Sequence, residues 1–153
     1  MQPCIRFANI DDLSSLLEIE ELSFSKHDYD LLKKQNYKYL IKKSNSDIRI
    51  CEINKKPIGS SIIFYRKNAT FSRLYSIAVI PEYQNKGIGK VLLEDAELIS
   101  QKRGLTEIRQ EIRSDRNKLY EKYKEYGYSE YARSNNYYPD GSECIKLKKI
   151  IKC

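Results

Sequence analysis

The spacing of apolar residues predicts an alternation of strands and helices along the chain. An extended stretch at residues 4–8 precedes a helix that starts near Asp11 and Asp12 and carries leucines at helical spacing. The polar segment 26–46 predicts a second helix, placed where it could cover a substrate cleft. Residues 48–53 and 58–66 are two strand-like runs separated by an Asn-Lys-Lys-Pro turn, which predicts an antiparallel hairpin.

The second half of the chain continues the alternation. Residues 73–79 form an apolar strand ended by Pro81, and residues 87–103 present one apolar helical face before Gly104. The remaining predicted elements are a strand at 107–113, a helix at 117–126, and two strands at 128–133 and 144–150. The resulting order, β-α-(α)-β-β-β-α-β-α-β-β, predicts a mixed α/β sheet.

Length and composition fit a single globular domain covering residues 1–153. A chain of 153 residues can bury one sizeable core, and no repeat or linker divides it. Hydrophobic residues make up 41% and charged residues 32%, which excludes the disordered class. No apolar run reaches the roughly 20 residues that span a bilayer, and the start lacks the layout of a signal peptide. We therefore expect a cytoplasmic protein without membrane contact.

Charge and cysteine content narrow the chemistry only slightly. The net charge of +7 could favour an acidic partner, a nucleic acid or a phosphate-rich cofactor. The 13 tyrosines could stack on bases, but a general bias towards Lys, Ile, Tyr and Asn explains them more simply, so nucleic acid is not favoured. The four cysteines form no C-x-x-C pair, which predicts reduced, mostly core-filling thiols and no metal site.

The most informative segment is residues 78–90, where a strand breaks at proline and re-enters the fold as a helix through a glycine-containing loop. Gly87 and Gly89 let the backbone approach a bulky ligand. The unpaired N–H groups of the first helical turn lie at the positive end of the helix dipole, which suits a pyrophosphate. The simpler interpretation is a glycine-softened helix start that binds nothing.

The spacing of these residues excludes two common phosphate-binding loops. A Walker A loop needs Ser or Thr after its lysine and a glycine six positions before the lysine, whereas Lys90 is followed by Val91 and no glycine stands at the earlier position. A dinucleotide fingerprint needs a third glycine, and that position is Leu92.

The longer pattern Gln84-x-x-Gly87-x-Gly89, directly after a strand that ends Ile77-Ala78-Val79, resembles the acetyl-CoA motif of the GNAT superfamily of N-acetyltransferases. The resemblance covers nearly the whole chain, from an opening at residues 5–13 to a late helix and strand at residues 119–128. It implies a mostly antiparallel, twisted sheet flanked by helices, with a V-shaped splay between its central strands, and acetyl-CoA as cosubstrate.

The resemblance also assigns the coenzyme contacts. The strand residues Ile77, Ala78 and Val79 would hold the pantetheine. The turn would hold the pyrophosphate through Gln84, Asn85, Lys86, Gly87, Ile88, Gly89 and Lys90. A further coenzyme contact would fall on Asn117 or on its neighbour Arg116.

Acetyl transfer needs a neutral amine, so one group must accept a proton and another can protonate the departing sulfur. The only histidine, His27, lies in the early loop, which leaves carboxylates and tyrosines. Glu111 resembles the general base, and Tyr123 the general acid, of the ribosomal-protein alanine N-acetyltransferase branch. The alternatives are that Glu111 only pairs with a neighbouring arginine, Arg109 or Arg113, that Tyr123 is a core tyrosine, or that Tyr120 is the acid.

The segment around Tyr137, Tyr138 and Pro139 resembles the Asn-Tyr-Tyr-Pro turn of protein N-terminal acetyltransferases. With Phe24 from the early loop, these tyrosines would contact the acceptor, which implies a protein or peptide N-terminal α-amine acetylated by direct attack in a ternary complex. A small amine of polyamine or aminoglycoside type is the alternative within enzymes. A non-catalytic CoA-sensing or nucleic-acid-binding module is the alternative outside them, and monomer and homodimer are both open.

Overall fold

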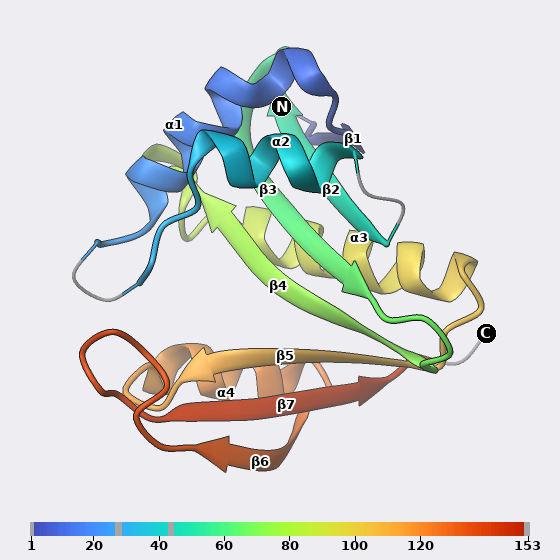
Figure 1. Cartoon of the computed structure of the whole chain (residues 1–153), viewed down its shortest axis with the longest axis vertical. Helices are drawn as coiled ribbons and strands as arrows, with labels where there is room; N and C mark the ends of the chain where they lie inside the picture. The colour runs from blue at the N-terminus through green and yellow to red at the C-terminus, as the bar shows by residue number, and fades with distance from the viewer. Residues whose placement is uncertain (1, 27–28, 43–44, 152–153) are drawn as a thin grey trace.

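The computed structural model describes residues 2–26, 29–42 and 45–151 (Figure 1). In chain order the elements are β1 (Cys4–Phe7), a 3₁₀ turn η1 (Ile10–Asp12), α1 (Leu13–Ser23), α2 (Lys34–Lys42), β2 (Ser46–Ile53), β3 (Lys56–Tyr65), β4 (Phe71–Val79), a 3₁₀ turn η2 (Pro81–Tyr83), α3 (Ile88–Lys102), β5 (Glu107–Arg113), α4 (Asn117–Glu125), β6 (Ser129–Ser134) and β7 (Cys144–Ile150). No helix among these residues is long and apolar enough to cross a membrane.

Seven strands form one sheet in the order β1-β2-β3-β4-β5-β7-β6, and every neighbouring pair is antiparallel except β4 with β5. Helices α1 and α2 cover one face of the first four strands, while α3 covers the opposite face (Figure 1). Residues of α3 and α4 enter one apolar cluster with residues of β5 and β7. The predicted mixed α/β class is confirmed.

The sheet divides between β4 and β5. These strands pair only from Phe71 with Glu107 to Leu74 with Gln110. Beyond Leu74, β4 stays with β3 as far as Val79, and β5 stays with β7, so the two halves separate (Figure 1). A register shift in the β3–β4 ladder leaves Tyr75 as an extra residue at this point. Because a bulge bends and twists its strand, it turns β4 away from β5. The predicted V-shaped splay is thus present.

The predicted elements are present with shifted bounds; for example, β3 starts at Lys56, inside the predicted turn. A 3₁₀ turn at Ile10–Asp12 precedes α1, so the α-helix itself starts at Leu13. The predicted second helix occupies only Lys34–Lys42 of the polar segment. Cys51 and Cys144 fill the core as free thiols, Cys4 is free but exposed, and Cys153 lies outside the described residues.

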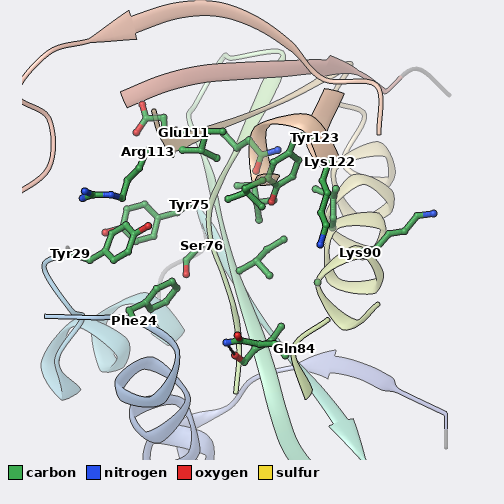
Figure 2. A pocket seen from close by; sticks show the side chains of 18 of the residues that line it. Phe24, Tyr29, Tyr75, Ser76, Gln84, Lys90, Glu111, Arg113, Lys122 and Tyr123 are labelled. Atoms are coloured by element: carbon green, nitrogen blue, oxygen red, sulfur yellow. Dashed lines mark hydrogen bonds between the residues drawn. The ribbon is translucent and has the colours of Figure 1, made fainter. Parts of the chain in front are cut away.

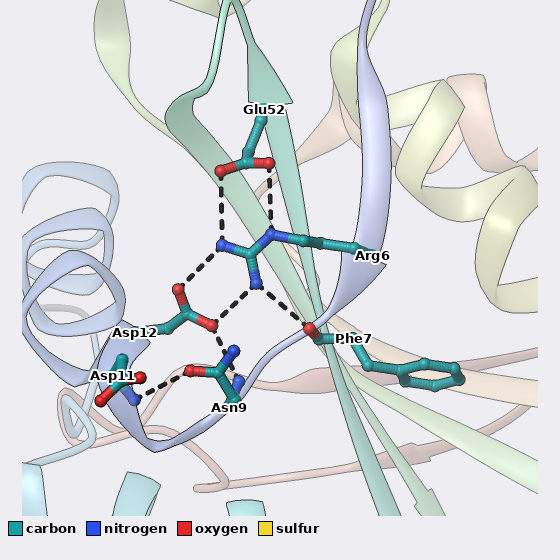
Figure 3. A network of polar contacts seen from close by, with 6 residues as sticks. All are labelled: Arg6, Phe7, Asn9, Asp11, Asp12 and Glu52. Atoms are coloured by element: carbon teal, nitrogen blue, oxygen red, sulfur yellow. Dashed lines mark hydrogen bonds and ion pairs between the residues drawn. The ribbon is translucent and has the colours of Figure 1, made fainter.

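A polar network fixes β1 to the start of α1 (Figure 3). The guanidinium of Arg6 donates to both carboxylate oxygens of Asp12 at 2.8 Å and to both of Glu52 at 3.2 and 3.3 Å. Asp12 also accepts from the backbone N–H of Asn9, whose side chain caps the 3₁₀ turn in return. The bonds from Arg6 hold the pKa of Asp12 below its usual range. The network therefore ties the first strand, the second strand and the first helix together.

Replacing Asp12 with Asn should lower the free energy of unfolding by about 1 kcal/mol at pH 7, because the charge-assisted bonds to a partly exposed arginine are lost. A carboxyl whose pKa is lowered by folding stabilises the protein above its unfolded pKa of about 3.9 and loses that effect as the pH falls. The difference between wild type and Asp12→Asn in urea unfolding should therefore shrink as the pH falls below about 4.

Asp11→Asn is the matched control, because Asp11 is exposed and adjacent in sequence. Equal losses in the two variants, or a loss in Asp12→Asn that does not change with pH, would contradict the assigned role of the Arg6 pair.

Candidate functional site

A cavity of about 530 Å³ lies where the two halves of the sheet separate. Its walls come from the diverging parts of β4 and β5, from α1 and the segment after it, from the start of α3, and from α4. Strand β4 passes between two groups of side chains: Glu111, Arg113 and Tyr29 lie on one side of it, and Tyr123 and Lys122 on the other (Figure 2). We call these the Glu111 side and the Tyr123 side of the cavity.

The turn that leads into α3 is open and rich in unused donors. Asn85 and Gly87 have positive φ angles of 61° and 84°, which reverse the chain after the 3₁₀ turn. Within the described chain, no backbone hydrogen bond is donated by the amides of residues 85–90. A Cβ added at Gly87 or Gly89 would meet no atom within 4 Å. The amides and the empty space beside the glycines suit a pyrophosphate at the N-terminus of this 15-residue helix.

The predicted coenzyme residues divide into four groups by position. Seven line the cavity, namely Ile77, Val79, Gln84, Asn85, Gly87, Gly89 and Lys90. The side chains of Ala78 and Ile88 are buried in the core between the sheet and α3, so only their backbones can face a ligand. Lys86 is exposed, with its ammonium 5.6 Å from the ring centroid of Tyr83. Neither Arg116 nor Asn117, at the start of α4, lines the cavity.

Gln84 has a structural task that the motif alone does not reveal. Its side-chain amide donates to the carbonyl of Val79 at 2.8 Å. This bond holds the turn against the last residue of β4, so it fixes the position of the turn relative to the free edge of β4.

Glu111 projects from β5 into the cavity, with its side chain only 16% exposed. Its Oε1 accepts from Arg73 Nη2 at 2.6 Å and from the hydroxyl of Tyr137, and its Oε2 lies 3.8 Å from Lys146 Nζ. The expected alternative partners are engaged elsewhere. Arg109 pairs with Glu107, and Arg113 pairs with aspartates at positions 115 and 140. The idea that Glu111 pairs with a neighbour on its own strand is therefore wrong, because its partner comes from β4.

Tyr123 is the one buried residue of α4, and it lines the cavity. Its ring packs edge-on against Tyr126 and Tyr128 at centroid distances of 6.2 and 5.4 Å. Burial raises the pKa of Tyr123 above its ordinary value, so the phenol stays protonated at neutral pH. Tyr120, one turn earlier, does not line the cavity and donates to Glu130 at 3.1 Å. Of the two tyrosines, only Tyr123 is therefore placed to reach a ligand in the cavity.

Four aromatic rings join two distant connections across the Glu111 side. Phe24 contacts Tyr29 after α1, Tyr29 contacts Tyr138 of the β6–β7 connection, and Tyr138 contacts Tyr137, with centroid distances of 5.1–5.7 Å. We call this chain of rings the aromatic wall. Burial and the bond to Glu111 raise the pKa of Tyr137 to about 12, so it acts as a donor. The three predicted acceptor-contact residues, Phe24, Tyr137 and Tyr138, all belong to the wall.

Arg113 supports the wall from the sheet. Its guanidinium carbon lies 5.7 Å from the ring centroid of Tyr29 and 5.1 Å from that of Tyr138. The same side chain, only 2% exposed, donates to Asp140 and Ser142 in the β6–β7 connection. Because planar guanidinium groups stack on aromatic rings, Arg113 fixes both the loop and the rings.

Sequence reasoning missed several cavity residues, among them Arg73, Tyr75 and Tyr29. An arginine inside an otherwise apolar strand was the available signal for Arg73. His27 lies outside the described residues. Among the residues that the structure describes, no group of three or more His, Cys, Asp or Glu side chains could hold a metal ion.

Comparison with known proteins identifies the family of the chain. Residues 13–128 match the family model described as the acetyltransferase (GNAT) family. The [Ribosomal protein bS18]-alanine N-acetyltransferase of Escherichia coli K12 is 38% identical over 72 residues, which is 46% of this chain and 49% of that protein. The aligned segments cover 49–64% of the lengths of the curated relatives.

Two solved structures share the fold over nearly their full length. The ribosomal-protein-S18-alanine N-acetyltransferase from Escherichia coli superposes with a TM-score of 0.87 at 23% identity, covering 99% of this chain and 96% of that one. The PaiA N-acetyltransferase from Thermoplasma acidophilum, in complex with coenzyme A, superposes with a TM-score of 0.81 at 23% identity, covering 98% and 99%.

Replacing Gly89 with Ala should weaken coenzyme A binding about tenfold, or about 1.4 kcal/mol, without lowering the melting temperature. The added methyl group enters space that is empty in the protein and that a bound pyrophosphate would occupy, while alanine suits a helix better than glycine. Calorimetric titration with coenzyme A and a thermal melt test both parts. Glu94→Ala, at an exposed position of the same helix, should bind like wild type. Unchanged affinity in Gly89→Ala would place the phosphates elsewhere.

Proposed function

Because the chain belongs to the acetyltransferase (GNAT) family, we propose that it transfers the acetyl group of acetyl-CoA to a primary amine, and that this amine is the N-terminal α-amine of a protein or peptide. The observation that carries the proposal is the cavity at the splay. One side of it presents the open amides of the turn before α3, and the other side presents a carboxylate and an aromatic wall.

The residues on the Tyr123 side suit the coenzyme. The turn at residues 84–90 would hold the pyrophosphate, and the free edge of β4 from Tyr75 to Val79 would bond the pantetheine as a neighbouring strand would. In this proposal the thioester would lie at the splay, between Tyr123 and Glu111, which both line the cavity.

The chemical step uses one proton acceptor and one donor. The acceptor nitrogen attacks the thioester carbonyl carbon, so that a C–N bond forms and the C–S bond breaks. The ammonium first loses a proton to solvent, so the acceptor reacts as a neutral amine. As the nitrogen attacks, the carboxylate of Glu111 takes a proton from it, and the departing thiolate takes the phenolic proton of Tyr123. The proton held by Glu111 then restores Tyr123 through water. The products are an N-acetyl amide, free coenzyme A and one proton released to solvent.

The Glu111 side supports a peptide acceptor better than a polyamine. Its charged groups are mixed, with Glu20, Asp30 and Glu111 facing Arg73 and Arg113. A polycation that approached Glu111 would meet the guanidinium of Arg73 beside it. The aromatic wall offers flat apolar faces and hydroxyls that suit peptide groups. The partial identity with a ribosomal-protein alanine N-acetyltransferase supports the same acceptor class.

Glu111→Gln and Tyr123→Phe should each lower kcat on a peptide acceptor by about 100-fold or more, which is typical for the loss of a general base or acid. Thiol release from acetyl-CoA, measured over a panel of peptides and small amines, provides the rates. Tyr120→Phe is the matched control, because it removes a hydroxyl one helical turn away that points to Glu130, and it should keep the wild-type rate. Wild-type rates in both test variants would overturn this chemistry.

The pH profile follows from the same groups. An α-amine has a pKa of about 8, so kcat/KM should rise about tenfold per pH unit below 8 and level off above it. The raised pKa of buried Tyr123 keeps the donor protonated, so kcat should not fall before about pH 10. A descending limb between pH 8 and 9.5 that Tyr123→Phe abolishes would contradict this assignment.

A further inference from the structure

The carboxylate of Glu111 is paired with cationic side chains in the cavity. Its carboxylate contacts Arg73 at 2.6 Å and lies 3.8 Å from Lys146, so two cations share one anion. An incoming ammonium would have to approach the carboxylate beside these positive charges. Like charges at such short range disfavour binding, so a plain amine is a poor match for this arrangement.

The guanidinium of Arg73 has N–H donors that are not used by the described residues. Its Nη2 donates to Glu111 and, at 3.2 Å, to the hydroxyl of Tyr137. Its Nε is buried and has no hydrogen-bond partner among the described residues. The side chain remains 39% exposed and lines the cavity. An arginine that is half-open to a binding site and incompletely bonded is suited to a carboxylate, whose geometry matches the guanidinium.

The other charged groups on the Glu111 side of the cavity are not equivalent to Arg73. Arg113 is saturated by Asp115, Asp140 and Ser142. Glu20 accepts from the hydroxyl of Tyr37 at 2.7 Å and from a backbone amide, so it belongs to the packing of α1. Asp30 is exposed in the segment after α1. Around Glu111 itself the balance is therefore two cations to one carboxylate.

We propose that Arg73 selects acceptors whose first residue carries an acidic side chain; this inference rests on the proposed function. The acceptor carboxylate takes the guanidinium of Arg73, and this releases Glu111 to receive the proton of the α-amine. Because Arg73 touches Glu111, the selected carboxylate must lie within one side chain's reach of the reacting nitrogen, which places it on the first residue of the peptide. The substrate class is thus a peptide or protein that begins with Asp or Glu.

Two pairs of peptides test this specificity, one beginning with Asp or Asn and the other with Glu or Gln, and otherwise identical. With wild type, kcat/KM measured by thiol release should favour the acidic member of each pair on the order of tenfold or more, as expected for a charge-assisted bond. Arg73→Gln should abolish that preference, so that the ratio of kcat/KM within each pair falls to about one, whatever the variant's overall rate. Arg73→Lys, which keeps the charge but loses the planar fork, should give an intermediate ratio.

Arg109→Gln is the control, because Arg109 is on the same face of the sheet, pairs with Glu107 and does not line the cavity. It should keep the wild-type ratio. A wild-type enzyme that prefers the amide peptides, or an Arg73→Gln variant that keeps the acidic preference, would overturn the assignment. Absence of acetylation of every peptide, with turnover on a small amine, would instead refute the proposed acceptor class and this inference with it.

Discussion

The separation of β4 from β5 after Leu74 is the constraint on which the rest of the site depends. A sheet normally satisfies its backbone groups by pairing each strand with its neighbours, and here one edge of β4 is left without a neighbour from Tyr75 to Val79. The bulge at Tyr75 produces this separation inside a regular ladder. The free edge, the cavity beside it and the approach of groups from both faces of the sheet all follow from one extra residue.

The two sides of the cavity are held by different means. On the Tyr123 side, backbone conformation and the clamp from Gln84 to Val79 define an open turn. On the Glu111 side, side chains dominate: Arg113 supports the aromatic wall, and Arg73 and Tyr137 hold the carboxylate. Backbone geometry suits a ligand part that is always the same, such as a pyrophosphate. Side-chain recognition suits an acceptor that must be distinguished from others.

The features that were predictable from the sequence are those that depend on residues close together in the chain. Apolar spacing predicted the strands, the helices and the mixed α/β class, whereas the splay was implied by the family resemblance that the turn at residues 84–90 carries. Glu111 and Tyr123 were identified by resemblance, and both line the cavity. The Arg73–Glu111 pair was not predictable, because it joins residues 38 positions apart through the register of two parallel strands. The alternation within β5 suggested Arg109 and Arg113 instead.

The aromatic wall is built from the segment after α1 and the connection between β6 and β7, neither of which contributes to the strand pairing of the central sheet. The turn that precedes α3 belongs to a third, separate stretch of sequence. The two connections that carry the wall can therefore change in sequence or in length while the turn at residues 84–90 keeps its shape. Such modularity allows one scaffold to acquire new acceptors, and it makes the two connections the natural place for an engineer to begin.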